Sequence, residues 1–97
     1  MRFEWDEDKA KLNRNKHGVG FDEASSVFHD EDARLFDDPD HSDDEDRFLL
    51  LGLSARARTL VVVHCVRGEG EVIRIISARP AMPRERDAYS GHGGTET

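Results

Sequence analysis

The chain has 97 residues, 36% of them hydrophobic and 36% charged, which leaves room for one domain with one modest core. No apolar run approaches the ~20 residues that a membrane span needs, and the first residues lack the apolar stretch of a signal peptide. Cys65 is the only cysteine, so an internal disulfide is excluded. We therefore expect a cytoplasmic protein.

The net charge of −7 is divided unevenly along the chain. Residues 1–46 hold 16 acidic and 6 basic side chains, a balance of −10, whereas residues 47–97 hold 5 acidic and 8 basic ones, a balance of +3. Such a division indicates two surfaces with different partners, and the alternative is an ordinary solvated surface.

The first residues have the pattern of a short strand followed by a helix. Residues 3–5 alternate between apolar and polar, as strands do. Asp6 suits the N-cap of a helix, and Lys16 and His17 suit its C-terminal end, where cations interact favourably with the helix dipole. Gly18 then predicts a left-handed residue that ends this helix.

A second helix is expected over residues 21–29, with Gly20 as its N-cap. The apolar residues of this segment recur at helical spacing and form one stripe, made of Phe21, Ala24, Val27 and Phe28. The two helices would form a hairpin that precedes the sheet.

Residues 30–46 are the most acidic part of the chain. They include ten carboxylates around Leu35-Phe36, which predicts a brief edge strand, and a turn signal at residues 37–40. His41 within this cluster suggests a metal site, but the spacing does not fit the calcium-binding loop with its glycine and closing glutamate. We favour a solvated loop, and no cofactor is expected.

Three strand-like runs follow, over residues 47–53, 59–66 and 71–79. Short connectors with turn residues join them, which predicts an antiparallel meander with the apolar middle run at its centre. Pro83 suits the first position of a last helix, and the glycine-rich residues 90–97 predict a disordered tail. The result is one α+β domain over residues 1–89, in the order strand, helix, helix, four strands, helix.

The chain lacks the sequence signatures of nucleotide and metal sites, namely the P-loop, Gly-x-Gly-x-x-Gly, paired cysteines and His-Glu-x-x-His. No arrangement singles out a serine or Cys65 as a nucleophile. The residues left as candidates for a site are arginines and a few side chains that can act as acids or bases. This set is suited to the cleavage of RNA without a metal ion. In that reaction the 2′-hydroxyl attacks, arginines neutralise charge on the phosphate, and another side chain moves protons.

Two arginines of the last strand are candidates for binding a phosphate. Period two puts Arg74 on one face of the strand and Arg79 on the other, so they meet one phosphate only if a bend at Ala78–Pro80 swings Arg79 round. In the last helix, Glu85 and Tyr89 are four residues apart and share a face. Glu85 suits either an ion pair that orients an arginine or the acceptance of a proton.

The candidates also have purely structural interpretations. Arg74 suits a cross-strand salt bridge, and Tyr89 suits packing at the end of a helix. His64, in the central strand, is typical of a satisfied core histidine. Lys16 and His17 suit a helix C-terminus.

Several sequence blocks are informative together. The first half contains Phe3-Glu-Trp-Asp6, Asn13-x-x-Lys16-His17-Gly18-Val19-x-Phe21-x-Glu23-Ala24 and Val27-Phe28. The second half of the set is Asp38-Pro-Asp-His-Ser42, Glu45-x-Arg47-Phe48, Gly52, Arg74-Ile-Ile-Ser-Ala-Arg79, Glu85-Arg86 and Tyr89. In this order, over residues 3–89, the chain resembles the BrnT family of toxins.

The resemblance implies a RelE-like fold and a toxin of a type II toxin–antitoxin system, an endoribonuclease that inhibits translation. It implies two partners, RNA and a BrnA-like antitoxin with a ribbon-helix-helix DNA-binding domain. The complex would be a heterotetramer that represses its own promoter, with operator DNA bound only through the antitoxin. The alternatives are a non-catalytic binding module of the same fold and a toxin that acts by occupying the ribosome.

The family's motif positions give the candidate site residues. Those carried over as catalytic are Arg47, Arg74, Arg79, Glu85 and Tyr89. The further candidates, for substrate binding, are Lys16, His17, His64 and Arg86, and the first three are also reserve proton carriers. Where the family often has Ser or Thr at the starts of the last two helices, this chain has Gly20 and Met82, so weaker helix starts are expected.

Overall fold

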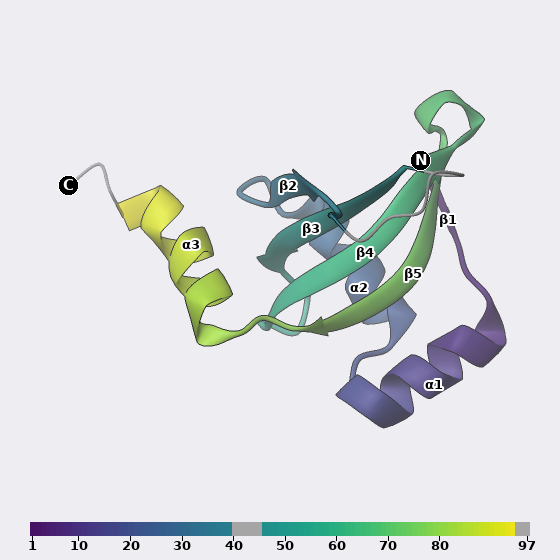
Figure 1. Cartoon of the computed structure of the whole chain (residues 1–97), viewed down its shortest axis with the longest axis horizontal. Coiled ribbons are helices and arrows are strands. Elements are labelled where there is room, and N and C mark those ends of the chain that lie inside the picture. Colours follow the sequence, from purple (N-terminus) through teal and green to yellow (C-terminus); the bar gives the residue numbers. More distant parts are fainter. Residues whose placement is uncertain (40–45, 95–97) are drawn as a thin grey trace.

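The computed structural model describes residues 1–39 and 46–94. Its elements in chain order are β1 (Arg2–Glu4), α1 (Glu7–His17), α2 (Phe21–Ser26), the 3₁₀ turn η1 (Val27–His29), β2 (Arg34–Asp37), β3 (Arg47–Leu53), β4 (Thr59–Arg67), the 3₁₀ turn η2 (Gly68–Gly70), β5 (Val72–Pro80) and α3 (Pro83–Gly94). The strands form one sheet in the order β1-β5-β4-β3-β2 (Figure 1). β1 is parallel to β5 and the other neighbours are antiparallel, so the predicted α+β order and the meander are confirmed.

Helix α1 begins and ends where the sequence predicts. The Asp6 carboxylate accepts hydrogen bonds from the backbone N–H groups of Asp8, at 2.8 Å, and Lys9, at 3.3 Å, which the helix itself leaves unpaired. At the other end Gly18 has a φ of 71°, in the left-handed region that favours glycine. Its N–H donates to the carbonyl of Arg14 and closes the last turn.

Helix α2 is shorter than predicted, because it ends at Ser26 and the chain continues as the 3₁₀ turn η1. The hydroxyls of Ser25 and Ser26 donate back to the carbonyls of Asp22 and Glu23. Such bonds compete with the helical ladder and favour its end. Gly20 is the N-cap as predicted, without a side-chain cap.

The main core lies between the sheet and helices α1 and α2, and Figure 1 shows α2 passing behind the strands. Its largest fully buried side chains are Phe21, Leu60, Ile75, Val19, Val27 and Val62. Buried Asn13 of α1 joins the helix to β5, because its amide donates to the carbonyls of Val19, at 2.9 Å, and Ala78, at 2.8 Å. Its Oδ1 accepts from the N–H of Ala78 at 3.1 Å, so α1 closes part of the strand edge that β1 leaves open.

A bulge in β5 places Arg74 and Arg79 on the same face of the sheet. The pairing with β4 passes over Ile76, which opposes no residue of that strand. This extra residue reverses the alternation, so that Ile75 and Ala78 both point into the core and the two arginines both point away from it. The prediction of opposite faces is therefore wrong, because the bulge at Ile76, and not a bend at Ala78–Pro80, brings Arg79 to the face of Arg74.

Helix α3 begins at Pro83, as predicted, and runs to Gly94. The sequence predicts a disordered tail from residue 90, but residues 90–94 continue the helix. A residue added to an existing helix gains a backbone hydrogen bond without a new nucleation cost. Residues 95–97 lie outside the described part of the chain. No helix among the described residues is long and apolar enough to cross a membrane.

The predicted edge strand at Leu35-Phe36 is confirmed as β2, at the edge of the sheet beside β3. Asp40 and His41, which suggested a turn and a metal site, lie outside the described residues. Within residues 1–39 and 46–94, no group of three or more His, Cys, Asp or Glu side chains is placed to hold a metal ion.

Candidate active site

The sheet face away from α1 and α2 carries most of the candidate residues, and we call it the open face. Arg47 of β3, Cys65 of β4 and Arg74 of β5 are register partners, so their side chains form one row across it. Arg79 lies on the same face, opposite Val61 of β4. Helix α3 stands at the Arg79 end of the open face, where it packs against β3 (Figure 1).

Arg79 and Glu85 form a bidentate ion pair at the start of α3. The two terminal nitrogens of Arg79 donate to the two carboxylate oxygens of Glu85, at 2.7 and 2.8 Å. Glu85 also accepts from the backbone N–H of Met82, at 2.8 Å. Met82 is the N-cap position and has no side-chain oxygen, so the carboxylate three residues later supports the helix start that the sequence left weak.

This environment favours the interpretation of Glu85 as the residue that orients Arg79 over its interpretation as a proton acceptor. The hydrogen bond from Arg79 is the largest cause that lowers the pKa of Glu85 to about 2. A carboxylate with this pKa is a weak base at neutral pH. The Arg79 side chain is 34% exposed, so its remaining N–H donors are accessible to a substrate.

Tyr89 ties α3 to the loop that follows η1. Its hydroxyl donates to the Asp30 carboxylate at 2.6 Å, and this bond is the largest cause that raises the pKa of Tyr89 to about 12. The same carboxylate oxygen accepts from the N–H of Leu53 at 2.8 Å. A phenol with so high a pKa and a fixed acceptor transfers protons poorly near neutral pH, so the geometry favours the packing interpretation of Tyr89.

Replacement of Tyr89 by phenylalanine is expected to lower the stability of the fold and leave its architecture unchanged. The loss of one hydrogen bond to a carboxylate costs about 1–2 kcal/mol. In a domain of this size each 1 kcal/mol lowers the Tm by about 4–8 °C. Thermal unfolding of the two proteins at neutral pH measures this shift, and an unchanged Tm would show that the bond to Asp30 does not stabilise α3.

His64 lies in the core, on the opposite side of β4 from the arginines. The residue is 2% exposed, and its ring packs against Phe28 and Phe48 with centroid distances of 4.8 and 5.9 Å. Desolvation by burial lowers its pKa, so the imidazole is neutral at pH 7. The expected substrate-binding role of His64 conflicts with this position, because no substrate reaches a ring that is enclosed by aromatic side chains.

Lys16 and His17 line an open groove of about 560 Å³ between the end of α1 and the edge of β5. Ser77 forms part of the opposite wall. β1 pairs with β5 only as far as Arg74, so it does not cover the strand edge at this point. The groove therefore opens at Ser77, two residues before Arg79 in β5.

The other candidate arginines do not join Arg79. Arg74 donates to Glu4 of β1 at 2.9 Å, so the cross-strand salt bridge expected for it is present. Arg86 donates to a backbone carbonyl just before α3, and Arg47 is half-buried at the start of β3. The β4 partners of Arg74 and Arg79 are four residues apart, which separates the two arginines by roughly 14 Å along the strand. They do not meet at one phosphate.

A polar network that the sequence analysis missed lies between the α1–α2 turn and the β3–β4 hairpin. Buried Glu23 accepts from Nε of Arg58 at 3.0 Å and from the hydroxyl of Ser54 at 2.7 Å. Arg58 also donates to the carbonyl of Gly18 at 3.0 Å. The bond from Arg58 is the largest cause that lowers the pKa of Glu23. The two partners are 35 residues apart, and no local pattern links them.

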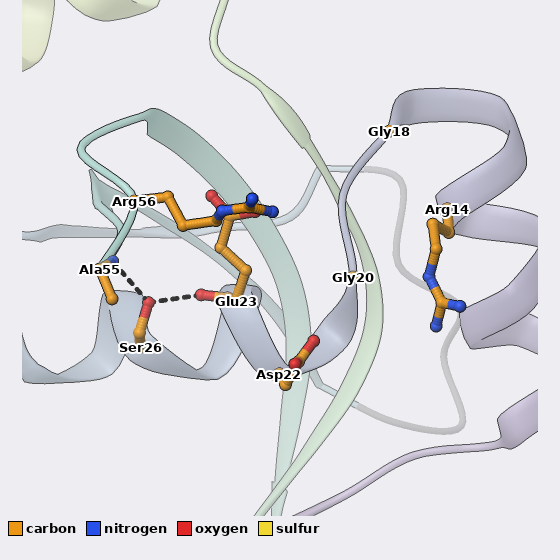
Figure 2. Close-up of a pocket in the computed structure, with 8 residues that line it drawn as sticks. All are labelled: Arg14, Gly18, Gly20, Asp22, Glu23, Ser26, Ala55 and Arg56. Carbon is orange, nitrogen blue, oxygen red and sulfur yellow. Dashed lines mark hydrogen bonds between the residues drawn. The ribbon is translucent and has the colours of Figure 1, made fainter.

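Figure 2 shows an open pocket of about 720 Å³ beside this network. On its floor the Ser26 hydroxyl donates to the carbonyl of Glu23 at 2.5 Å and accepts from the N–H of Ala55 at 2.8 Å. Arg14 and Arg56 extend from opposite walls (Figure 2). The hydrogen bonds join two loops of the fold, so we assign this region to stability and not to the candidate site.

The chain is similar to a known protein family and to a solved structure. The family described as "Ribonuclease toxin, BrnT, of type II toxin-antitoxin system" matches residues 5–85. The crystal structure of the Brucella abortus ribonuclease toxin, BrnT, is similar over 84% of this chain and 97% of that chain, with 27% identity and a TM-score of 0.64. No curated protein matches the chain.

Proposed function

The chain belongs to the BrnT family of ribonuclease toxins of type II toxin–antitoxin systems, and from this premise we propose that it cleaves RNA without a metal ion and so inhibits translation in the cytoplasm. The observation that carries the proposal is the Arg79–Glu85 pair on the open face. An arginine fork that a carboxylate holds in place matches the geometry of a phosphate.

In the proposed reaction the 2′ oxygen attacks the adjacent phosphorus and the 5′ oxygen leaves. The products are a 2′,3′-cyclic phosphate and a 5′-hydroxyl. Arg79 donates to the phosphate oxygens, whose negative charge grows in the transition state, and a donor that is already oriented stabilises this charge without reorganisation. Glu85 keeps the guanidinium in position, because its low pKa leaves it a carboxylate and a weak base.

The proton carriers in this proposal are Lys16 and His17. Their support is the groove that opens at Ser77, beside the strand that carries Arg79. Tyr89 has a different role, since its hydroxyl is bonded to Asp30. His64 is also left out of the reaction, because it lies in the core.

A type II system pairs its toxin with an antitoxin. We propose a BrnA-like antitoxin with a ribbon-helix-helix domain, whose dimer would join two toxins in a heterotetramer. The uneven charge supports separate surfaces for the two partners. RNA would occupy the arginines of residues 47–97, and the antitoxin would also contact the acidic residues 1–46.

The purified chain with single-stranded RNA in excess EDTA tests the proposal. We expect cleavage with 2′,3′-cyclic phosphate ends, and no cleavage of RNA in which every 2′-hydroxyl is methylated. Cleavage only after Mg²⁺ or Zn²⁺ is added would overturn the metal-free mechanism. Inhibition of cell-free translation without new RNA ends would instead favour a toxin that occupies the ribosome.

A further inference from the structure

A second group of arginines lies at the end of the open face opposite to Arg79. The Glu4 carboxylate of β1 accepts from Arg74 at 2.9 Å and lies 4.0 Å from Arg67 of β4. Arg2 is exposed and shares this face, because it stands two residues before Glu4 in the same strand. We call Arg2, Arg67 and Arg74 the distal arginine cluster.

We propose that the distal arginine cluster binds a second phosphate of the same single-stranded RNA whose cleaved phosphate lies at Arg79. The inference rests on the proposed function and extends it from one phosphate to a track. Arg74 and Arg79 face the same way because of the bulge at Ile76. At the ~3.4 Å rise of a stacked strand, their roughly 14 Å separation spans about four nucleotides, and an unstacked strand spans it with fewer.

The cluster keeps both charge and hydrogen-bond donors for a ligand. Arg67 and Arg74 share one carboxylate, that of Glu4, so together with exposed Arg2 these four side chains carry a charge of +2. A guanidinium has five N–H donors, and the bond to Glu4 takes one from Arg74. The side chains of Arg74 and Arg67 are 31% and 54% exposed. A phosphate therefore reaches donors of both arginines while Glu4 keeps them in place.

The composition of this surface favours a nucleic-acid backbone over a protein partner. Protein interfaces are centred on apolar and aromatic side chains, whereas phosphate binding needs cations. Of the exposed large hydrophobic residues of the described chain, Met1 and Val66 are next to a cluster residue in sequence, and the others are Leu12, Leu35, Phe36, Leu53 and Met82. Val66 is next to Arg67 in β4 but points to the other face of the sheet, as its pairing with Ile73 shows. Without an aromatic side chain for stacking, the cluster is expected to bind RNA independently of its sequence.

Binding to a 20-nucleotide 2′-O-methyl RNA, followed by fluorescence anisotropy at several salt concentrations, tests the cluster separately from cleavage. The double variant Arg67→Gln/Arg74→Gln is expected to raise the Kd by about tenfold to a hundredfold. The slope of log Kd against log salt concentration should fall by about 0.7 for each lost contact. Arg56→Gln is the matched control, because Arg56 is exposed in the β3–β4 hairpin, at the opposite end of the sheet.

Cleavage assays distinguish this inference from the proposed function. With a 20-nucleotide RNA the double variant should raise KM and leave kcat within about twofold, whereas with a dinucleotide it should match the wild type. If the wild-type chain binds the 2′-O-methyl RNA but does not cleave unmodified RNA, the proposed function is contradicted, whereas the binding track is still supported. A double variant that binds that RNA as tightly as the Arg56→Gln control would overturn the track.

Two further results are decisive. If the double variant does not fold, Arg67→Gln alone gives the answer, since this side chain is more than half exposed and an unchanged Kd and salt slope would overturn the proposal. If the double variant loses antitoxin binding but binds RNA like the wild type, the proposed RNA track is also overturned, and the cluster is assigned to antitoxin binding.

Discussion

Replacement of Arg79 by alanine is expected to reduce kcat/KM for RNA cleavage by about a hundredfold to a thousandfold, with the fold intact. This is the usual cost of removing one preorganised donor to the charge of a transition state. Arg79 fits that role because Glu85 fixes its two terminal nitrogens while a third of its side chain stays exposed. In cells, the same variant should lose the growth arrest that the proposed function predicts for the wild-type chain.

Two further variants separate the charge of Arg79 from its geometry. Arg79→Lys keeps the charge but loses the planar fork, so an intermediate loss is expected. Arg56→Ala removes an exposed arginine of the β3–β4 hairpin, at the same end of the sheet as Arg79 but outside the candidate site, and its rate should match the wild type. Full activity of Arg79→Ala, with a circular dichroism spectrum like that of the wild type, would remove Arg79 from the mechanism.

Glu85→Gln tests whether Glu85 positions Arg79 or takes a proton. An amide still accepts a hydrogen bond from Arg79, so a positioning role predicts a loss of about tenfold and an unchanged pH profile above pH 4. A general base would lose as much activity as Arg79→Ala, together with the acidic limb of the profile. The pKa of about 2 favours the first result.

The sequence was sufficient for the parts of the fold that local chemistry decides. Asp6 and Gly18 mark the ends of α1 because a carboxylate caps free N–H groups and glycine adopts a positive φ. The meander followed from apolar runs with short connectors. The bulge at Ile76 was missed, since neither glycine nor proline marks it and period two assumes an unbroken ladder.

The candidate site was predictable as a set of residues but not as an arrangement. Motif positions indicated both Arg79 and Glu85, and their contact lies within six residues of chain. The roles of His64 and Tyr89 depend on neighbours far away in sequence, namely Phe28 and Asp30. A single sequence carries no information about such distances, so the structural interpretations stated for both residues could be weighed only once the fold was known.

The largest stability effect is expected at the Glu23–Arg58 pair, and it should be asymmetric. The Glu23 side chain is 5% exposed and that of Arg58 is 38% exposed. Arg58→Ala leaves a buried carboxylate without its cation, which costs about 3 kcal/mol or more. Glu23→Ala leaves an arginine that water can still solvate, so a smaller loss is expected. Thermal and urea unfolding measure both losses. Lys11→Ala, at an exposed position of α1, is the control and should change stability by less than about 0.5 kcal/mol.

The pH dependence of stability gives an independent test of the same pair. The pKa of Glu23 is lowered in the folded protein, mainly by the hydrogen bond from Arg58. Ionised Glu23 therefore adds to the free energy of unfolding at pH values above its ordinary pKa near 4.5. As the pH falls towards the lower pKa that Glu23 has in the folded protein, this contribution to the free energy of unfolding is lost. The reason is that Glu23 of the unfolded chain, with its higher pKa, takes up a proton at a higher pH than Glu23 of the folded chain. Glu23→Gln has no such proton to bind, so its stability should fall less than that of the wild type between pH 5 and pH 3. Parallel pH curves for the two proteins would mean that the bond from Arg58 does not lower the pKa of Glu23 in solution.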